Sequence, residues 1–459
     1  MNLFEPTLHS LARATVVTAA TLLLLLATGA GVRAARHRGL PILLWPAMAS
    51  LLAPGFAIAI TYFDIAMKRD AFGRDQFYCL LVWLRYSPLA LLVVWLTPPA
   101  FSPEAMHCFR HAHPLPLWRR AMLELREWGR GLWLGMALVF LLAFQEFELA
   151  TTWNMRAWPV ALFDAQAGGL ALIESLRLAA PPFLIQVLLI VILAWLVRRG
   201  GQANDSREFS SGQTAICPRT SIGLAVFLFS AVVGFLSLCA APSAAIGWLA
   251  SVVIFHNHAD SLIGAPWQQI WNGLGIAAAA TAFAWLCAGW IGDRRSPRWL
   301  LALPGLFGPM LCGLLLVALM QVPPLHLLRD TILPPVFGLM LVLLPFSLLL
   351  RLGIETTRDR AALHVARGVG APRAKWQLAG WPQVCAVVLL FCFGYGDFTI
   401  NSLLAPPQFT SASARLLNLL HYGRSSALMV MFTLSFAVPL AVALLTALFV
   451  RFYPRHRAS

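Results

Sequence analysis

Charge is scarce in this chain of 459 residues, because Asp, Glu, Lys and Arg together make up only 12% of it. A soluble domain has about 25%. Hydrophobic residues account for 59%, and this excess excludes an ordinary soluble protein. Since one bilayer crossing takes roughly 20 apolar residues, a chain of this length has room for roughly ten to twelve spans. The composition therefore predicts a polytopic membrane protein in a lipid bilayer.

Lysine is almost absent, with Lys68 and Lys375 the only two, and neither follows a glycine. The phosphate-binding loop GxxxxGK[ST] therefore occurs nowhere in the sequence. If ATP drives this protein, another subunit has to hydrolyse it. The sequence also offers no catalytic cluster, so we predict neither an enzymatic activity nor a bound cofactor.

The eight cysteines include no CxxC pair, and most lie in apolar runs, which argues against a disulfide framework and against a zinc site. One short stretch has the residue types of metal ligands: His107, Cys108, His111 and His113. The surrounding loop is basic and would repel a cation, and no second Cys/His cluster accompanies it. We therefore interpret the stretch as a surface loop and predict no metal.

Apolar segments predict eleven membrane spans, at residues 11–32, 40–63, 78–100, 131–147, 181–197, 221–242, 271–291, 300–320, 333–350, 381–398 and 428–450. The loops and the C-terminal tail on one side hold 24 of the 34 Arg and Lys residues, and those on the other side hold 8. Positively charged loops stay in the cytoplasm. This bias predicts a multi-pass membrane protein with its N-terminus outside and its C-terminus in the cytoplasm. Arginines scattered in this way fit loops better than a nucleic-acid-binding face, so we expect no nucleic acid partner.

The first apolar run ends in small residues, as a cleaved signal peptide would. Its arginines, Arg33, Arg36 and Arg38, follow the run instead of preceding it, which suits a retained anchor. We interpret the run as an anchor, and a cleaved leader is the alternative.

Three segments recur in the same order about 250 to 260 residues later: 43–60 resembles 301–318, the span around Pro88 resembles that around Pro345, and 140–150 resembles 391–401. The last match places Glu146 opposite Asp397. The displacement is six spans, so both copies cross the membrane in the same sense, as a parallel repeat. We predict a first half at 1–200 with five spans, a polar cytoplasmic linker at 201–220, and a second half at 221–459 with six spans.

The cytoplasmic loop at 351–380 is the most informative segment. Apolar residues recur at helical spacing between residues 362 and 369, while arginines project elsewhere. Gly370, followed by Ala–Pro, ends this helix, and a second short helix is expected at 373–378. The loop is therefore predicted to be an elbow at the membrane surface with one apolar ridge, and such a ridge facing water needs a partner.

The stretch HVARGVGAPRAKWQLAGWP in this loop resembles the EAA loop of permease subunits of ABC importers. Ala366 and Gly370 fit that pattern, His364 stands where the family has Glu, and Pro382 comes one residue early. Residues 394–424 resemble the periplasmic turn of fused permeases of the ferric-iron and thiamine type. The resemblance covers most of residues 40–450 and implies the all-α type I permease fold in two halves.

The corresponding loop of the first half, at 102–128, departs further from the pattern. In one register His107 aligns with His364 and Arg110 with Arg367, and in another Glu104 opens the family triplet. Either register lacks the turn glycine. We therefore describe Glu104, His107 and Arg110 as a degenerate first coupling loop.

The resemblance implies a permease of the cell inner membrane that forms the translocation path and is driven by cytoplasmic ABC ATPase subunits, with an extracytoplasmic solute-binding protein as a further partner. The implied ATPase-coupling residues are His364, Ala366, Arg367, Gly370 and Arg373. Ferric iron, thiamine and organophosphonates are solutes of permeases of this outline, and the sequence does not discriminate among them.

Three acids and one arginine lie near the ends of spans or within them. We predict that Glu146 and Asp397 face the translocation path at symmetric positions, with a place at the headgroup level as the alternative. Arg85 is expected to pair with a carboxylate or to extend outward. A proton- or ion-coupled secondary transporter that uses Glu146, Glu148 and Asp397 is the alternative function.

Overall fold

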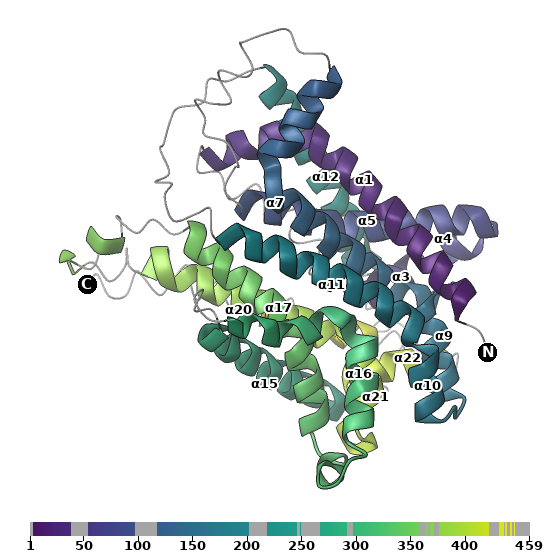
Figure 1. The fold of residues 1–459 in the computed structure, drawn as a ribbon. Helices are drawn as coiled ribbons and strands as arrows, with labels where there is room; N and C mark the ends of the chain where they lie inside the picture. Colours follow the sequence, from purple (N-terminus) through teal and green to yellow (C-terminus); the bar gives the residue numbers. More distant parts are fainter. Residues whose placement is uncertain are drawn as a thin grey trace. The chain divides into compact units, whose positions relative to one another are not determined.

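The computed structural model is described here for the following residues: 3–37, 54–96, 117–201, 218–245, 248, 267–291, 297–357, 363–365, 368–370, 376–421, 431–435, 437, 441–442 and 445. Every regular element among them is a helix, and they contain no β-strand (Figure 1). The predicted all-α fold is thus confirmed for this part of the chain.

Seven helices in the described residues are long and apolar enough to cross a membrane: Phe4–Thr28, Ala71–Val94, Gly131–Thr152, Ala225–Ala245, Trp267–Ile291, Leu300–Leu319 and Leu333–Glu355. An eighth candidate is the pair Leu172–Leu178 and Ala180–Ile192, which is bent by 54°. The helix Trp381–Gly396 is apolar but shorter. These helices fit a polytopic membrane protein. The predicted spans at 40–63 and 428–450 lie largely outside the described residues, so the total of eleven stays a prediction.

The chain forms two compact units. Unit 1 comprises Met1–Ala53 and Ile58–Pro242, and unit 2 comprises Pro54–Ala57 and Ser243–Ser459. Helix α12 (Pro218–Phe235) therefore groups with unit 1, where it packs against α1 (Phe4–His37). The sequence assigned residues 221–242 to the second half, and that division of the chain stays a prediction.

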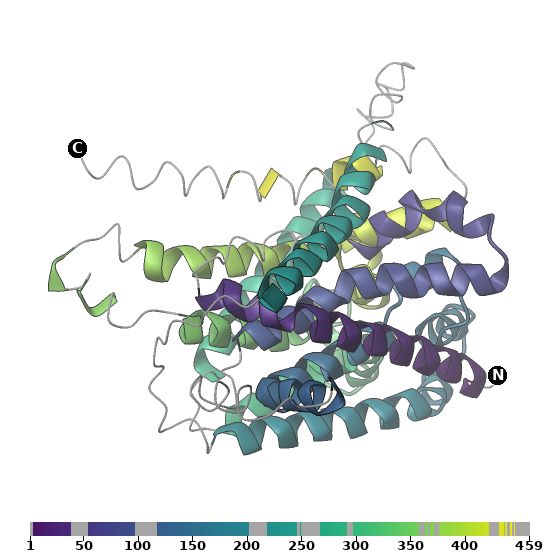
Figure 2. The ribbon, with the colours of Figure 1, turned by 90° about the horizontal axis from the view of Figure 1, so that it is seen from above.

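Unit 1 is built around α1, α5 (Ala71–Leu96) and α7 (Leu117–Phe144), which all pack against one another. Figures 1 and 2 both show α1 and α5 side by side. The other helices of this part of the chain are α3 (Gly55–Thr61, at the unit boundary), α4 (Phe63–Met67), α8 (Glu148–Thr152), α9 (Trp158–Ala167), α10 (Leu172–Leu178) and α11 (Ala180–Gly201). Helix α11 packs against α7.

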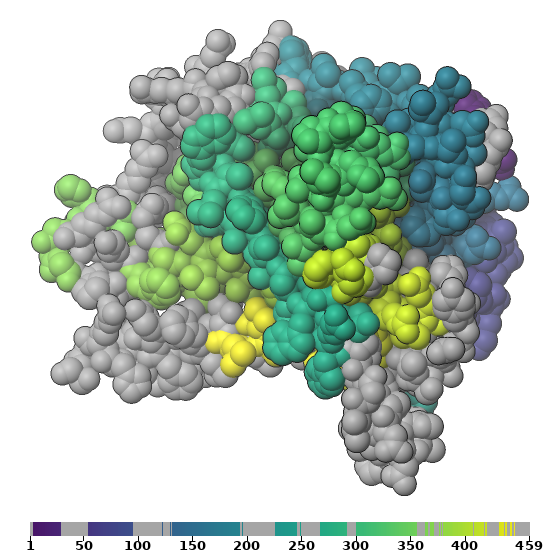
Figure 3. All heavy atoms as spheres, turned by 90° about the horizontal axis from the view of Figure 1, so that it is seen from below, coloured from purple at the N-terminus to yellow at the C-terminus, as the bar shows by residue number. Residues whose placement is uncertain are grey.

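Unit 2 is built around α15 (Trp267–Ile291), α17 (Leu333–Thr357) and α20 (Trp381–Gly396), which again pack against one another. The remaining elements are the 3-10 helices η3 (Pro297–Phe307), η4 (Leu325–Leu328) and η6 (Pro407–Phe409), the π-helical turn η5 (Trp376–Gly380), and α16 (Gly308–Leu319), α21 (Thr399–Leu404) and α22 (Ala412–His421). Helix α16 packs against α21, and α15 packs against α22. On the face shown in Figure 3, the yellow surface of α21 and α22 adjoins the teal and green surfaces of α15 and α16.

Each unit contains a long helix with an internal proline, Pro88 in α5 and Pro345 in α17. Proline lacks the N–H that a helix needs, yet neighbouring helices make it tolerable inside a membrane span. In each unit a later helix, α7 or α20, is followed by a turn that contains an acid and then a phenylalanine, and a short helix comes next. The two units thus share this order of elements.

Candidate functional site

The loop after α17 presents two apolar side chains to solvent. Leu363 is buried, whereas Val365 is 61% exposed and Val369 is 76% exposed. The backbone N–H of Val369 donates to the carbonyl of Val365 at 2.9 Å, so the two valines lie one helical turn apart. His364 is exposed as well. These valines are the part of the predicted ridge that the structure describes.

Gly370 follows this turn with φ +67°. A Cβ at this position would meet nothing within 4 Å, so the need for glycine comes from the left-handed backbone and not from a lack of space. The chain then enters η5 and α20. Of the predicted coupling residues, Ala366, Arg367 and Arg373 lie outside the described residues, and so do Glu104, His107 and Arg110 of the first loop.

Glu146 lies in the turn between α7 and α8 and is 4% exposed. Its Oε1 accepts the backbone N–H of Leu149 at 3.2 Å, three residues on. A carboxylate at the start of a helix satisfies N–H groups that have no partner within the helix. This hydrogen bond positions α8 relative to the end of α7.

Arg85 of α5 reaches across to the same turn. Its Nη1 lies 3.3 Å from Oε2 of Glu146 and its Nη2 lies 3.3 Å from Oε2 of Glu148. The Tyr86 hydroxyl also donates to Oε2 of Glu146. The alternative in which Arg85 pairs with a carboxylate is thus confirmed. These four side chains form a buried polar network that ties α5 to the α7–α8 turn.

Two neighbouring hydrogen bonds strengthen the same region of unit 1. Gln145 Nε2 donates to Oε1 of Gln186 at 2.9 Å, which joins α7 to α11. The indole Nε1 of Trp158 donates to the carbonyl of Phe144 at 2.8 Å. Gln186 and Trp158 are fully buried. Buried polar contacts of this kind are directional and hold helices in one arrangement.

Asp397 takes the corresponding place in unit 2, between α20 and α21, and is 8% exposed. Its Oδ1 accepts the backbone N–H of Ile400 at 2.9 Å, again three residues on. Its backbone carbonyl accepts hydrogen bonds from Asn401 Nδ2 at 2.9 Å and from Ser413 Oγ at 3.0 Å. The turn is thereby fixed to α21 and to the start of α22.

The two turns have one construction. In each, a carboxylate oxygen accepts the N–H three residues ahead, and the next residue is a buried phenylalanine, Phe147 at 4% and Phe398 at 1%. The equivalence that the sequence proposed for Glu146 and Asp397 thus has a structural counterpart. Whether either acid faces a translocation path stays a prediction.

The surroundings of the two turns differ. In the register that aligns Pro88 with Pro345, Val342 stands opposite Arg85 and Leu343 stands opposite Tyr86. Val342 is 3% exposed and Leu343 is fully buried, and both belong to the apolar core of unit 2. A polar network therefore occupies in unit 1 the place that apolar packing occupies in unit 2. Applying the repeat register to Arg85 would have revealed this difference, but its partners could not be inferred from the sequence.

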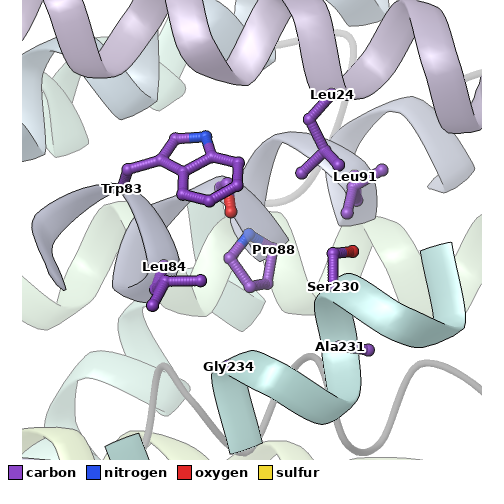
Figure 4. A pocket seen from close by; sticks show the side chains of 9 residues that line it. Leu24, Trp83, Leu84, Pro88, Leu91, Ser230, Ala231 and Gly234 are labelled. Carbon is purple, nitrogen blue, oxygen red and sulfur yellow. The ribbon is translucent and has the colours of Figure 1, made fainter. Parts of the chain in front are cut away.

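A small cavity lies within unit 1 (Figure 4). Its volume is about 10 Å³, and its lining includes Trp83 and Pro88 of α5 and Ser230 of α12. In the close-up these side chains surround the same space. A volume of this size holds about one water molecule, so the cavity is too small to be a solute-binding site.

Among the described residues, no group of three or more His, Cys, Asp and Glu side chains could hold a metal ion. The stretch with His107, Cys108, His111 and His113 lies outside them. Comparison of the chain with protein families, curated proteins and solved structures found no match.

Proposed function

We propose that the chain is the membrane-spanning permease of an ABC-type importer, moved by a separate cytoplasmic ATPase that binds the loop at 351–380. The observation that carries this proposal is the exposed pair Val365 and Val369, one helical turn apart and followed by a left-handed glycine. The ATPase has to be another chain, because this sequence contains no phosphate-binding loop.

The loop has the properties of a docking element. Burying a valine side chain contributes about 1.5 kcal/mol to stability. Two exposed valines on one helical turn would therefore add to the free energy of binding when a partner covers them. Gly370 fixes the direction in which the chain leaves that turn. A shaped ridge without reactive groups suits a mechanical contact better than a catalytic one.

The shared construction of the two units is a second support. An importer permease needs two similar bundles that move against each other, and here each unit has three mutually packed apolar helices and one acid–phenylalanine turn. The resemblance of residues 351–424 to fused permeases suggests a small solute such as ferric iron or thiamine. It also suggests an extracytoplasmic binding protein that delivers this solute.

The contacts of Glu146 bear on its proposed place in the path. Its side chain is engaged with Arg85, Tyr86 and the N–H of Leu149, so a cationic solute would have to compete with a guanidinium. The carboxylate of Asp397 accepts the N–H of Ile400, and we propose both acids as residues of the path.

The test places a photoreactive residue at Val369 in the full chain and crosslinks it in native membranes. The matched control places the same group at Phe283, an exposed apolar residue of α15. We expect Val369 alone to capture a protein that hydrolyses ATP, and we expect the purified complex to show ATPase activity that depends on this chain. Capture of no ATPase, with uptake that collapses under an uncoupler while ATP is maintained, would instead establish the ion-coupled carrier.

A further inference from the structure

Arg351 makes a close contact between two helices of unit 2. It lies in α17, six residues before that helix ends at Thr357. Its guanidinium carbon is 4.2 Å from the centre of the Trp285 ring of α15. Its Nη2 also donates to the backbone carbonyl of Trp285 at 2.8 Å. A single side chain thus contacts both the Trp285 ring and the backbone of α15.

Gly289 makes this contact sterically possible. A Cβ at Gly289 would lie 3.1 Å from the guanidinium carbon and from both terminal nitrogens of Arg351. Gly289 is also four residues after Trp285, so its own N–H is the helical donor to the carbonyl that Arg351 uses. A carbonyl oxygen has two lone pairs and accepts both donors. The missing side chain therefore opens the space through which the guanidinium reaches that oxygen.

The contact lies at the end of a small apolar cluster. Ala288 and Ile291 of α15 pack there against Leu344 of α17 and Ala302 of η3. In a membrane, apolar packing alone does little to hold two helices in register, because lipid tails are as apolar as the side chains. A cation over an aromatic ring together with a charged hydrogen bond supplies the directional contact that this packing lacks.

Arg351 lies near the end of α17, the helix that precedes the loop in the sequence. The loop with Val365 and Val369 follows α17 in the sequence, so a displacement of that loop is passed along the chain to the last turns of α17. In unit 1 the aligned residue is Val94, which is apolar and buried. The arginine contact therefore occurs in the unit whose loop keeps the turn glycine.

We propose that Arg351 is a positioning residue that joins the end of α17 rigidly to α15, so that α15 follows when the loop moves. We call the contact of Arg351 with Trp285 and Gly289 the α15–α17 joint. The part played by an ATPase rests on the proposed function above, whereas the joint itself is a property of this chain and is testable without a partner.

The experiment measures hydrogen–deuterium exchange of the full chain in lipid nanodiscs. Arg351→Met removes the guanidinium and keeps a long side chain. Gly289→Leu keeps the arginine in the sequence but occupies the space of its guanidinium, and leucine is a good helix former. We expect each change to raise amide exchange about fivefold to tenfold, both near residues 285–291 and in the loop at 363–370. Arg351→Lys keeps the charge but loses the planar fork, so its exchange should fall between wild type and Arg351→Met.

The control is Arg329→Met, which removes an exposed arginine of unit 2 from the connection before α17. Its exchange should match wild type, and amides of α20 should stay protected in every variant. The decisive result is that of Gly289→Leu, because the proposal requires a change in α15 to raise amide exchange in the loop as well. If its exchange rises only around residue 289, or if neither variant changes the loop, the joint is refuted even when an ATPase is captured at Val369. Conversely, failure to capture an ATPase refutes the proposed function and leaves a measured joint intact.

Discussion

Arg85 and Glu146 form an ion pair between α5 and the α7–α8 turn, although 61 residues separate them in the sequence. Their side chains are 8% and 2% exposed, and Nη1 lies 3.3 Å from Oε2. A charge at membrane depth is costly unless it is paired. Each of these residues therefore depends on the other, and the pair joins α5 to the turn that follows α7.

The first prediction concerns this dependence. Arg85→Met should destabilise unit 1 by about 3 to 5 kcal/mol, because it leaves a buried carboxylate without its cation. Adding Glu146→Gln to the same chain should restore part of that loss. Unfolding in a detergent titration measures both changes. Arg156→Met is the matched control, since its ion pair with Glu5 is largely exposed and should be worth less than about 1 kcal/mol. Equal losses in the two arginine variants would contradict the assigned role.

The pairing of Arg85 also shows where sequence reasoning stops. An arginine inside an apolar run requires a partner on physical grounds, so the need for a carboxylate is predictable. Which carboxylates pair with Arg85 depends on how α5 packs against α7, and an apolar sequence pattern contains no information on how two helices pack. The sequence aligned Glu146 with Asp397 because the residues around each turn recur in order, and in the structure each of these carboxylates accepts the N–H three residues ahead.

The loop shows the same division between what can and cannot be inferred. Helical spacing predicted the ridge, and a glycine before Ala–Pro predicted its end, since both are local properties. The contact of Arg351 with Trp285 was not predictable, because it joins residues 66 positions apart. A glycine at position 289 gave one retrospective signal, as a small residue often marks the close approach of two membrane helices.

The second prediction concerns the turn at Gly370, whose φ is +67°. Gly370→Val forces a β-branched residue into a left-handed conformation, which costs about 1 to 2 kcal/mol and favours a different turn. We expect the protein to remain in the membrane while uptake no longer follows ATP hydrolysis. Gly370→Asn should keep the coupling, because Asn tolerates this conformation. Gly368→Ala is the control, since Gly368 has an ordinary φ and open space around it. Identical coupling in Gly370→Val and Gly368→Ala would argue against the loop assignment.

The third prediction separates the two roles of Asp397. Asp397→Asn keeps an oxygen that accepts the N–H of Ile400, so the turn should fold and the thermal stability should change by less than about 1 kcal/mol. It removes the negative charge, and uptake of a cationic solute should fall severalfold if the acid faces the path. Asp397→Ala removes the hydrogen bond as well and should lower stability in addition. Unchanged uptake by the Asn variant would assign Asp397 to the structure of the turn alone.

The fourth prediction tests the exposed ridge itself. Val365→Glu and Val369→Glu place a charge on side chains that are 61% and 76% exposed, so neither change should alter stability by more than about 0.5 kcal/mol. Both should weaken binding of the ATPase by at least about tenfold, because a carboxylate would have to lose its water in an apolar groove. The control is Leu327→Glu, at a residue that is 80% exposed in the connection between α16 and α17. Pull-down of the ATPase with each variant measures the effect. Since Leu327→Glu adds the same charge to the same unit, a loss confined to the two valine variants is due to the ridge, and a loss shared by all three would show that net charge is responsible.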